Sequence, residues 1–108
     1  MKVIILGGAG FIGSHVADEL SKKGHKVTIF DTKKSKWLNK DQKMVVGDIF
    51  NYRALKNAIK NNQIVYNFAA LSDLDRAMHE PLVSARINIL GTVQALNLCK
   101  KYKVKRFI

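Results

Sequence analysis

Residues 2–13 read Lys2-Val3-Ile4-Ile5-Leu6-Gly7-Gly8-Ala9-Gly10-Phe11-Ile12-Gly13. The first part is a run of β-branched and aliphatic residues without a polar interruption, as in a strand that is buried on both faces. The glycines follow at once and fit both G-x-G-x-x-G, counted from Gly8, and the looser G-x-x-G-x-x-G, counted from Gly7. The pattern predicts a buried strand that runs directly into a phosphate-binding turn.

The glycines of this turn have distinct steric purposes. One allows the tight turn, one lets backbone N–H groups approach a pyrophosphate, and one lets the following helix pack closely on the strand. The helix that begins there points its positive end and its unpaired N–H groups at the anion. Gly7, Gly10 and Gly13 are therefore candidate cofactor-binding residues.

The context of the turn supports a dinucleotide site. The following helix has an apolar stripe of Ile12, Val16 and Leu20 beside Ala17, and Lys22-Lys23-Gly24 supplies a basic last turn and a glycine stop. A second strand, residues 26–30, ends on Asp31, where a carboxylate can bind the adenosine ribose hydroxyls and favour NAD. A glycine-rich turn in another kind of α/β protein is the alternative, and the strand, helix and acid together disfavour it.

The polar segment 32–42 follows Asp31 and predicts a lysine-rich loop. Lys33, Lys34 or Lys36 could contact the adenosine end of the cofactor or a 2′-phosphate, so NADP remains the alternative to NAD. A third strand is expected at 43–46, and Asn51 is the expected N-cap of a helix from Tyr52 to about Lys60. Asp48 either caps this helix or reaches the adenine.

A fourth strand at 64–68 opens onto the small residues Ala69 and Ala70. In an open parallel sheet the ligand crosses the crevice where the strand order reverses, which lies between the first and fourth strands. Residues 71–79 are a mixed segment, and residues 104–108 start a fifth strand. The expected fold is α/β, a Rossmann-type doubly wound parallel sheet truncated at the start of strand five.

Pro81 has the fixed φ that opens a helix, here expected at 81–101. One apolar stripe comprises Val83, Ile87 and Leu90, and another comprises Leu82, Ala85, Ile89, Val93 and Leu96. One sheet cannot cover both stripes, so we expect a second partner, another subunit. Asn88 and Thr92 interrupt the apolar surface, and they hydrogen-bond either to a strand-end loop or to local backbone.

Composition limits the function further. At 108 residues the chain holds one domain at most, and its net charge of +11 comes with lysine clusters at 22–43 and 100–106. No aromatic platform accompanies these lysines, which disfavours nucleic-acid binding.

Cys99 lies on a helical pattern and is expected to be a core residue. We expect no signal peptide, no uncharged apolar run long enough to span a bilayer, no metal site, and a cytoplasmic protein.

The whole chain resembles the extended short-chain dehydrogenase/reductase family, the NAD-dependent epimerases and dehydratases of nucleotide sugars. The matching motifs are residues 7–15, Asp31, Gly47-Asp48-Ile49, Asn67-Phe68-Ala69-Ala70, and the segment from Pro81 to Thr92. Leu6 departs from the pattern, since the family often has threonine there. The resemblance implies that NAD is held by the backbone of Phe11 and Ile12 at the pyrophosphate, Asp31 at the ribose, Asp48 and Ile49 at the adenine, and Phe68, Ala69 and Ala70 along the cofactor. It also implies a homodimer built through the helix 81–101.

In this family a Ser/Thr beyond strand five and a Tyr-x-x-x-Lys pair on the next helix transfer the proton that accompanies hydride transfer. Tyr52 and Lys56 lie on a different helix, and Tyr102 has Arg106 at i+4. No catalytic residue is therefore assigned, and residues 1–108 are expected to be an incomplete NAD(P)-binding domain. The expected function is the NAD-binding portion of a nucleotide-sugar epimerase or dehydratase. The alternatives are a non-catalytic dinucleotide-binding module and, less favoured, a basic nucleic-acid binder.

Overall fold

The computed structural model describes residues 1–108 and contains one parallel sheet of five strands, in the order β3-β2-β1-β4-β5. The strands are β1 (Lys2–Leu6), β2 (Lys26–Asp31), β3 (Gln42–Val46), β4 (Ile64–Asn67) and β5 (Arg106–Phe107). The helices are α1 (Phe11–Lys22), α2 (Tyr52–Ile59), α3 (Leu74–His79), α4 (Pro81–Ala85), the π-helical η1 (Arg86–Gly91) and α5 (Thr92–Lys101). This strand order confirms the predicted Rossmann-type fold.

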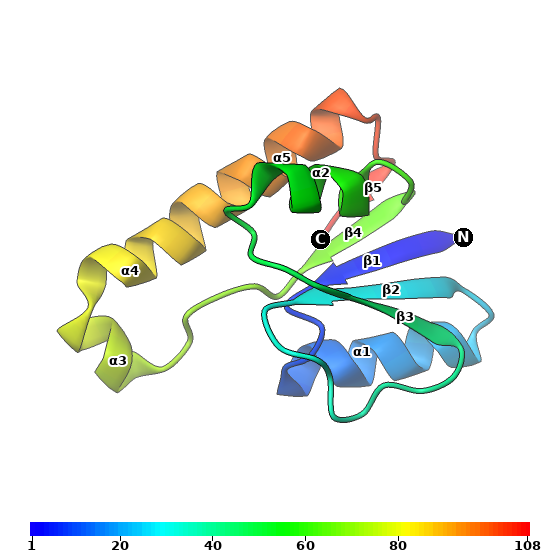
Figure 1. Cartoon of the computed structure of the whole chain (residues 1–108), viewed down its shortest axis with the longest axis horizontal. Helices are drawn as coiled ribbons and strands as arrows, with labels where there is room; N and C mark the ends of the chain where they lie inside the picture. The colour runs from blue at the N-terminus through cyan, green and yellow to red at the C-terminus, as the bar shows by residue number, and fades with distance from the viewer.

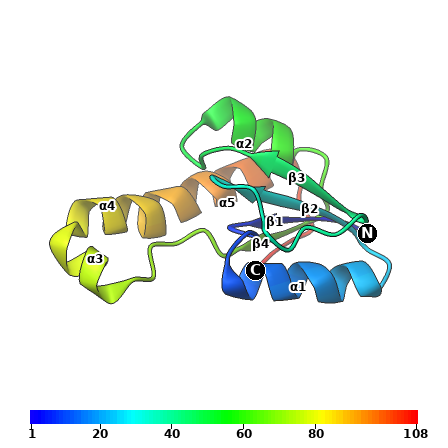
Figure 2. The same cartoon turned by 60° about the horizontal axis from the view of Figure 1, so that its bottom comes forward.

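The helices cover both faces of the sheet and make three layers. Figure 2 shows α1 below the sheet and α2 and α5 above it. Because successive side chains of a strand point to opposite faces, Ile4 and Leu6 of β1 pack in the α2 and α5 layer, whereas Ile5 packs against α1 with Ala17. Val3, Ile4, Ile5 and Leu6 have no exposed surface, as the uninterrupted apolar run predicts.

The ends of the predicted elements were mostly correct. Asn51 caps α2, since its side-chain Oδ1 accepts a hydrogen bond from the Ala54 amide at 3.1 Å. Gly24 ends the turn after α1 with a φ of +84°. Strand β3 begins one residue earlier than predicted, at Gln42. The Gln42 side chain is buried, and its amide donates a hydrogen bond to Asp18 at 2.9 Å.

The long helix predicted at 81–101 is present, but its middle turn is π-helical rather than α-helical. The wider i→i+5 turn keeps residues four apart on one face. The side toward the sheet therefore continues from Val83 and Ile87 to the buried Gly91 and Ala95, and Leu90 is 59% exposed. Leu90 was predicted to share one stripe with Val83 and Ile87, and the structure separates it from them.

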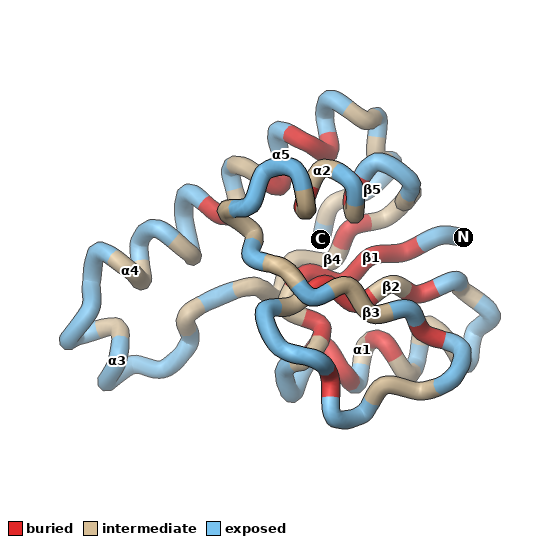
Figure 3. Tube along the Cα trace, viewed as in Figure 1, coloured by how far each residue is buried: buried red, intermediate tan, exposed pale blue.

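The other stripe of this helix is exposed, as the surplus of apolar residues predicts. Its large members Leu82, Ile89, Val93 and Leu96 are all exposed. Figure 1 shows that α4 extends beyond the edge of the sheet, with α3 at its tip, and Figure 3 shows that this extension is almost entirely exposed. Helix α3 was not predicted; Asp73 caps it by accepting a hydrogen bond from the Arg76 amide at 3.0 Å.

The segment Pro81–Lys101 is 21 residues long, and by length and composition alone it could cross a membrane. The expectation concerned an uncharged run, and this segment contains Arg86, Lys100 and Lys101, so the expectation is not contradicted. One such helix is weak evidence, because a helix that packs on a soluble protein's sheet passes the same test. Leu98 and Cys99 of α5 are core residues here, and the charged Arg86 lies within the segment. The helix does not indicate a membrane protein.

Cys99 is a core residue, as predicted, with 6% of its surface exposed. Burial raises the pKa of its thiol to about 11. The thiolate that would act as a nucleophile is thus disfavoured at neutral pH. Because the folded state holds this proton to higher pH than the unfolded state, the contribution of Cys99 to stability falls as the pH rises from about 9 to about 11.

Candidate functional site

A cavity of about 880 Å³ lies at the carboxyl ends of the parallel strands. Its walls come from the turn between β1 and α1, the end of β2, and the segments that follow β3 and β4. All eleven predicted site residues line it: Gly7, Gly10, Phe11, Ile12, Gly13, Asp31, Asp48, Ile49, Phe68, Ala69 and Ala70. The fold thus brings together residues that lie up to 63 positions apart, from 7 to 70, in the sequence.

The glycine turn is packed backbone against backbone. Gly7 has a φ of +75°, and a Cβ on it would lie 2.6 Å from the Ala69 nitrogen at the end of β4. A Cβ on Gly13 would lie 2.6 Å from the Gly7 carbonyl oxygen. These contacts leave no space for a side chain at either position, so the strand, the turn and the helix start are held close together.

Gly10 differs from these two glycines because it faces open space. A Cβ there would meet only the Gly7 carbonyl oxygen, at the ordinary contact distance of 3.5 Å. Gly10 lines the cavity, and its extended backbone, with φ of −77° and ψ of 179°, suits any residue. A side chain at position 10 would therefore occupy cavity space without straining the fold.

The start of α1 leaves three amide groups unpaired beside the cavity. The first intrahelical bond is donated by Ser14 to the Gly10 carbonyl at 3.0 Å, and the amides of Phe11, Ile12 and Gly13 have no hydrogen-bond partner in the chain. Ile12 is 61% exposed, so the apolar stripe predicted for α1 does not include it. Unpaired amides and the positive end of a twelve-residue helix form a site for an anionic group such as a pyrophosphate.

Asp31 holds the glycine turn from the end of β2. Its Oδ2 accepts a hydrogen bond from the Ala9 amide at 3.0 Å, and its Oδ1 accepts one from the Thr32 amide at 2.7 Å. The Oδ1 also accepts a longer hydrogen bond from the Thr32 hydroxyl at 3.4 Å, so Oδ2 is the oxygen that keeps a further lone pair for a hydroxyl donor. The carboxylate is thus fixed at the cavity, in reach of the glycine turn.

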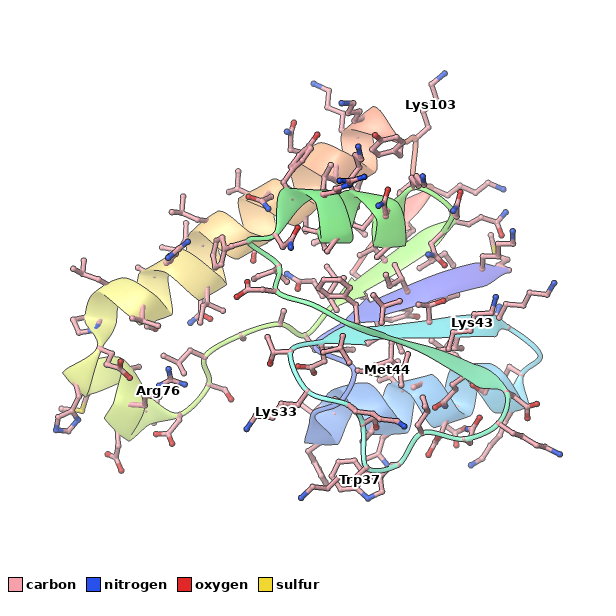
Figure 4. The ribbon with its side chains drawn as sticks, viewed as in Figure 1. Lys33, Trp37, Lys43, Met44, Arg76 and Lys103 are labelled. Atoms are coloured by element: carbon pink, nitrogen blue, oxygen red, sulfur yellow. The ribbon has the colours of Figure 1, made fainter.

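Of the lysine-rich loop after Asp31, only Thr32 lines the cavity. None of Lys33, Lys34 and Lys36 lines the cavity. Figure 4 shows Lys33 projecting outward from this loop, and Trp37 lies farther along it beside α1. The Asp31 carboxylate, directly before this loop, therefore lines the cavity, whereas the charged groups of these three lysines do not.

The segment after β3 forms the second wall. The Asp48 Oδ1 accepts a hydrogen bond from the Phe50 amide at 2.8 Å, so Asp48 orders its own turn while Asn51 caps α2. The alternative that Asp48 caps α2 was wrong. The phenyl ring of Phe50 also lies under the Arg86 guanidinium, 4.3 Å from the ring centroid.

The segment after β4 forms the opposite wall. The Asn67 Oδ1 accepts a hydrogen bond from the Ala69 amide at 3.3 Å, and the Asn67 Nδ2 donates to the Thr92 hydroxyl at 3.3 Å. The Thr92 hydroxyl in turn donates to the Asn88 carbonyl oxygen at 2.8 Å. Both predicted alternatives for the polar pair on the long helix therefore occur together, since Thr92 bonds to local backbone and also to a strand-end residue.

Several lining residues were not predicted, and two of them are cationic. Arg76 of α3 and Arg86 of η1 line the cavity with Val83 and Ile87. Arg76 also forms an exposed ion pair with Glu80, at 2.7 Å. Only Val83 and Ile87 had a signal in the sequence, as one apolar stripe; the positions of the two arginines depend on α3 and on the π turn.

The cavity contains no pair of side chains arranged for proton transfer of the Tyr-x-x-x-Lys type. Tyr52 and Lys56 do have this spacing, yet both lie on α2 and neither lines the cavity. The three histidines are separate, and no three His, Cys, Asp or Glu side chains gather where they could hold a metal ion. The arrangement can bind and orient a phosphate-containing ligand.

Fold and cavity together define a Rossmann-type dinucleotide-binding domain. The family model of the NAD dependent epimerase/dehydratase family matches residues 3–108. The chain belongs to this family.

Three relatives illustrate the similarity. A dTDP-D-glucose 4,6-dehydratase from Dictyostelium discoideum is 33% identical over 120 residues, which cover 99% of this chain and 28% of that protein. A UDP-glucose 4-epimerase sequence from Klebsiella pneumoniae is 31% identical, covering 100% of this chain and 86% of that sequence. The solved UDP-glucose 4-epimerase of Thermus thermophilus, a complex with NAD, superposes with a TM-score of 0.91 at 28% identity, covering 99% of this chain and 36% of that one. The chain spans about a third of most curated relatives that it matches.

Alanine substitutions at Gly13 and Gly10 should distinguish a glycine that the fold requires from one that only lines the cavity. Gly13→Ala forces backbone atoms apart, so we expect the free energy of unfolding to fall by about 1–3 kcal/mol. Gly10→Ala meets no close atom, and we expect a change within about 0.5 kcal/mol. Urea denaturation followed by circular dichroism measures both. Equal stability of the two variants would contradict the backbone contact assigned to Gly13.

Proposed function

We propose that this chain is the NAD-binding portion of a nucleotide-sugar epimerase or dehydratase. The observation that carries the proposal is the row of unpaired amides at the start of α1, beside a glycine turn with space only for backbone. The family membership and the NAD complex of a solved relative support NAD as the ligand. Residues 1–108 form the cofactor-binding domain in this proposal.

The cofactor contacts of this proposal are those that the family resemblance implies, and the positions of these residues in the cavity support them. The amides of Phe11 and Ile12 bind the pyrophosphate, and Gly7, Gly10 and Gly13 let it approach. Asp31 accepts hydrogen bonds from the adenosine ribose, Asp48 and Ile49 hold the adenine, and Phe68, Ala69 and Ala70 line the cofactor on the opposite side. A 2′-phosphate would meet the Asp31 carboxylate, and the nearby lysines lie outside the cavity wall, so NAD is favoured over NADP.

When bound, NAD accepts and returns a hydride, which is the chemistry of a transient oxidation of a sugar hydroxyl. This chain binds the cofactor, orients it through the helix start and the two walls, and removes part of it from water. It supplies no Tyr-x-x-x-Lys pair for the accompanying proton transfer, since neither Tyr52 nor Lys56 lines the cavity. A nucleotide sugar is the substrate of the complete enzyme in this proposal.

Isothermal titration calorimetry with NAD tests the binding function. We expect the unchanged chain to bind NAD and Gly10→Val to reduce the affinity by at least about 100-fold, because the isopropyl group fills the space of the pyrophosphate. Asn57→Val, at an exposed position of α2 outside the cavity and away from the long helix, is the matched control and should bind as the unchanged chain does. Full NAD affinity in Gly10→Val, or no binding by the unchanged chain, would refute the proposed site.

A homodimer through the helix 81–101 is the second part of the proposal. The exposed stripe of Leu82, Ile89, Val93 and Leu96 runs along the outer side of this helix, and water-exposed apolar stripes of this kind usually mark an interface. A second copy of the chain presents the same stripe, so two helices can cover each other about a twofold axis. The inner side of the helix remains on the sheet and the cavity.

Analytical ultracentrifugation measures this association. We expect the unchanged chain to form a concentration-dependent dimer and Val93→Asp to shift it to monomer, because a carboxylate would be buried in the interface. Asn57→Asp places the same charge on an exposed residue of α2, away from the stripe, and the dimer should persist. A monomer at all concentrations, or a dimer unaffected by Val93→Asp, would contradict the assignment.

A further inference from the structure

Two side-chain amides of the long helix reach the two opposite walls of the cavity. The Asn88 Oδ1 accepts a hydrogen bond from the Leu71 amide at 2.8 Å, and its Nδ2 donates to the Leu71 carbonyl oxygen at 3.2 Å. The Gln94 Nε2 donates to the Ile49 carbonyl oxygen at 2.7 Å. Leu71 and Ile49 line the cavity, whereas Asn88 and Gln94 do not.

The wall after β4 has little other support. Residues 69–72 make no backbone–backbone hydrogen bond, and they belong to no helix or strand. Their backbone is held by the side chains of Asn67, which binds the Ala69 amide, and of Asn88, which binds both polar groups of Leu71. The Asn88 side chain therefore provides hydrogen bonds that these residues do not receive from other backbone groups.

The wall after β3 depends on the helix in the same way. The Ile49 carbonyl has Gln94 as its hydrogen-bond partner, and the Ile49 side chain lies directly on Gly91, where a Cβ would overlap its Cδ1 atom. The Arg86 guanidinium covers the next residue, Phe50. One helix turn and its neighbours thus fix the main chain of residues 48–50 by a hydrogen bond, a close apolar contact and a cation–π contact.

The polar network also joins the two walls. Thr92, between Asn88 and Gln94, accepts a hydrogen bond from Asn67 and donates one to the Asn88 carbonyl. Residues of a single rigid element therefore hold the end of β4, the loop after β4 and the loop after β3. A shift of either amide would change the position of one wall relative to the other.

We propose that Asn88 and Gln94 are positioning residues that set the separation of the two cavity walls and hold both in place before the dinucleotide binds. This inference rests on the proposed NAD-binding function. A loop that is already ordered does not lose its conformational entropy on binding, so the two amides raise the affinity without touching the ligand. Ile49 is assigned to the adenine, so Gln94 acts on the adenosine half of the cofactor.

Calorimetry with NAD and with AMP, on the full 108-residue chain, tests this inference. We expect Asn88→Ala and Gln94→Ala each to raise the Kd for NAD by about fivefold to tenfold, the effect of losing one ordering hydrogen bond. Gln94→Ala should raise the Kd for AMP by the same factor. Asn97→Ala removes an exposed amide of the same helix that makes no side-chain hydrogen bond, and it should leave both values unchanged.

Hydrogen exchange of the Leu71 amide separates positioning from general destabilisation. Asn88→Ala should accelerate this exchange, whereas Gln94→Ala and Asn97→Ala should not. If an alanine variant does not fold, the isosteric Asn88→Asp and Gln94→Glu decide, since each replaces a donor to a wall carbonyl by an acceptor and should weaken NAD binding. Unchanged NAD affinity in folded variants of a chain that binds NAD overturns the positioning role alone. Absence of NAD binding in the unchanged chain overturns the proposed function.

Discussion

The backbone contact between the glycine turn and its neighbours is the constraint on which the rest of the site depends. Gly13 lies against the Gly7 carbonyl, and Gly7 lies against the chain at Phe68 and Ala69. These approaches bring the end of β1, the start of α1 and the end of β4 within van der Waals distance. With no side chains between them, the unpaired amides at the start of α1 face directly into the crevice where the sheet order reverses.

The two sides of the long helix, residues 81–101, contact different surroundings. Its inner side carries Asn88, Gly91, Thr92 and Gln94, which contact the segments at the two cavity walls, and its outer side carries the exposed apolar stripe. The π turn contributes Asn88 and Gly91 to these contacts, and α5 contributes Thr92 and Gln94. In the proposed enzyme the helix would join the cofactor site to the subunit interface.

Much of the fold and of the cavity could be predicted from the sequence, because local patterns determine them. A buried β-branched run, a glycine turn and an acid after the second strand specify a parallel sheet, and a parallel sheet gathers its strand ends at one edge. All eleven predicted site residues therefore line one cavity, although their contacts with a cofactor stay a prediction.

The features that were missed depend on packing between distant segments. The π turn that exposes Leu90, the position of Arg86 at the cavity, and the short helix that brings Arg76 to the cavity have no local sequence signal. The role of Asp48 was only partly predicted, because a carboxylate just before a helix can either cap the helix or order the turn in which it lies. In this structure Asn51 caps α2 and Asp48 orders its turn.

An NMR titration of the ¹⁵N-labelled chain with NAD tests the central claim most directly. The account predicts that the amide signals of Phe11, Ile12 and Gly13 shift most strongly, because their unpaired N–H groups gain the pyrophosphate as acceptor. Amides at the opposite edge of the sheet, such as those of Lys2 and Lys26, should not move. Shifts confined to that opposite edge, or no shift at Phe11, Ile12 and Gly13 at saturating NAD, would contradict the account.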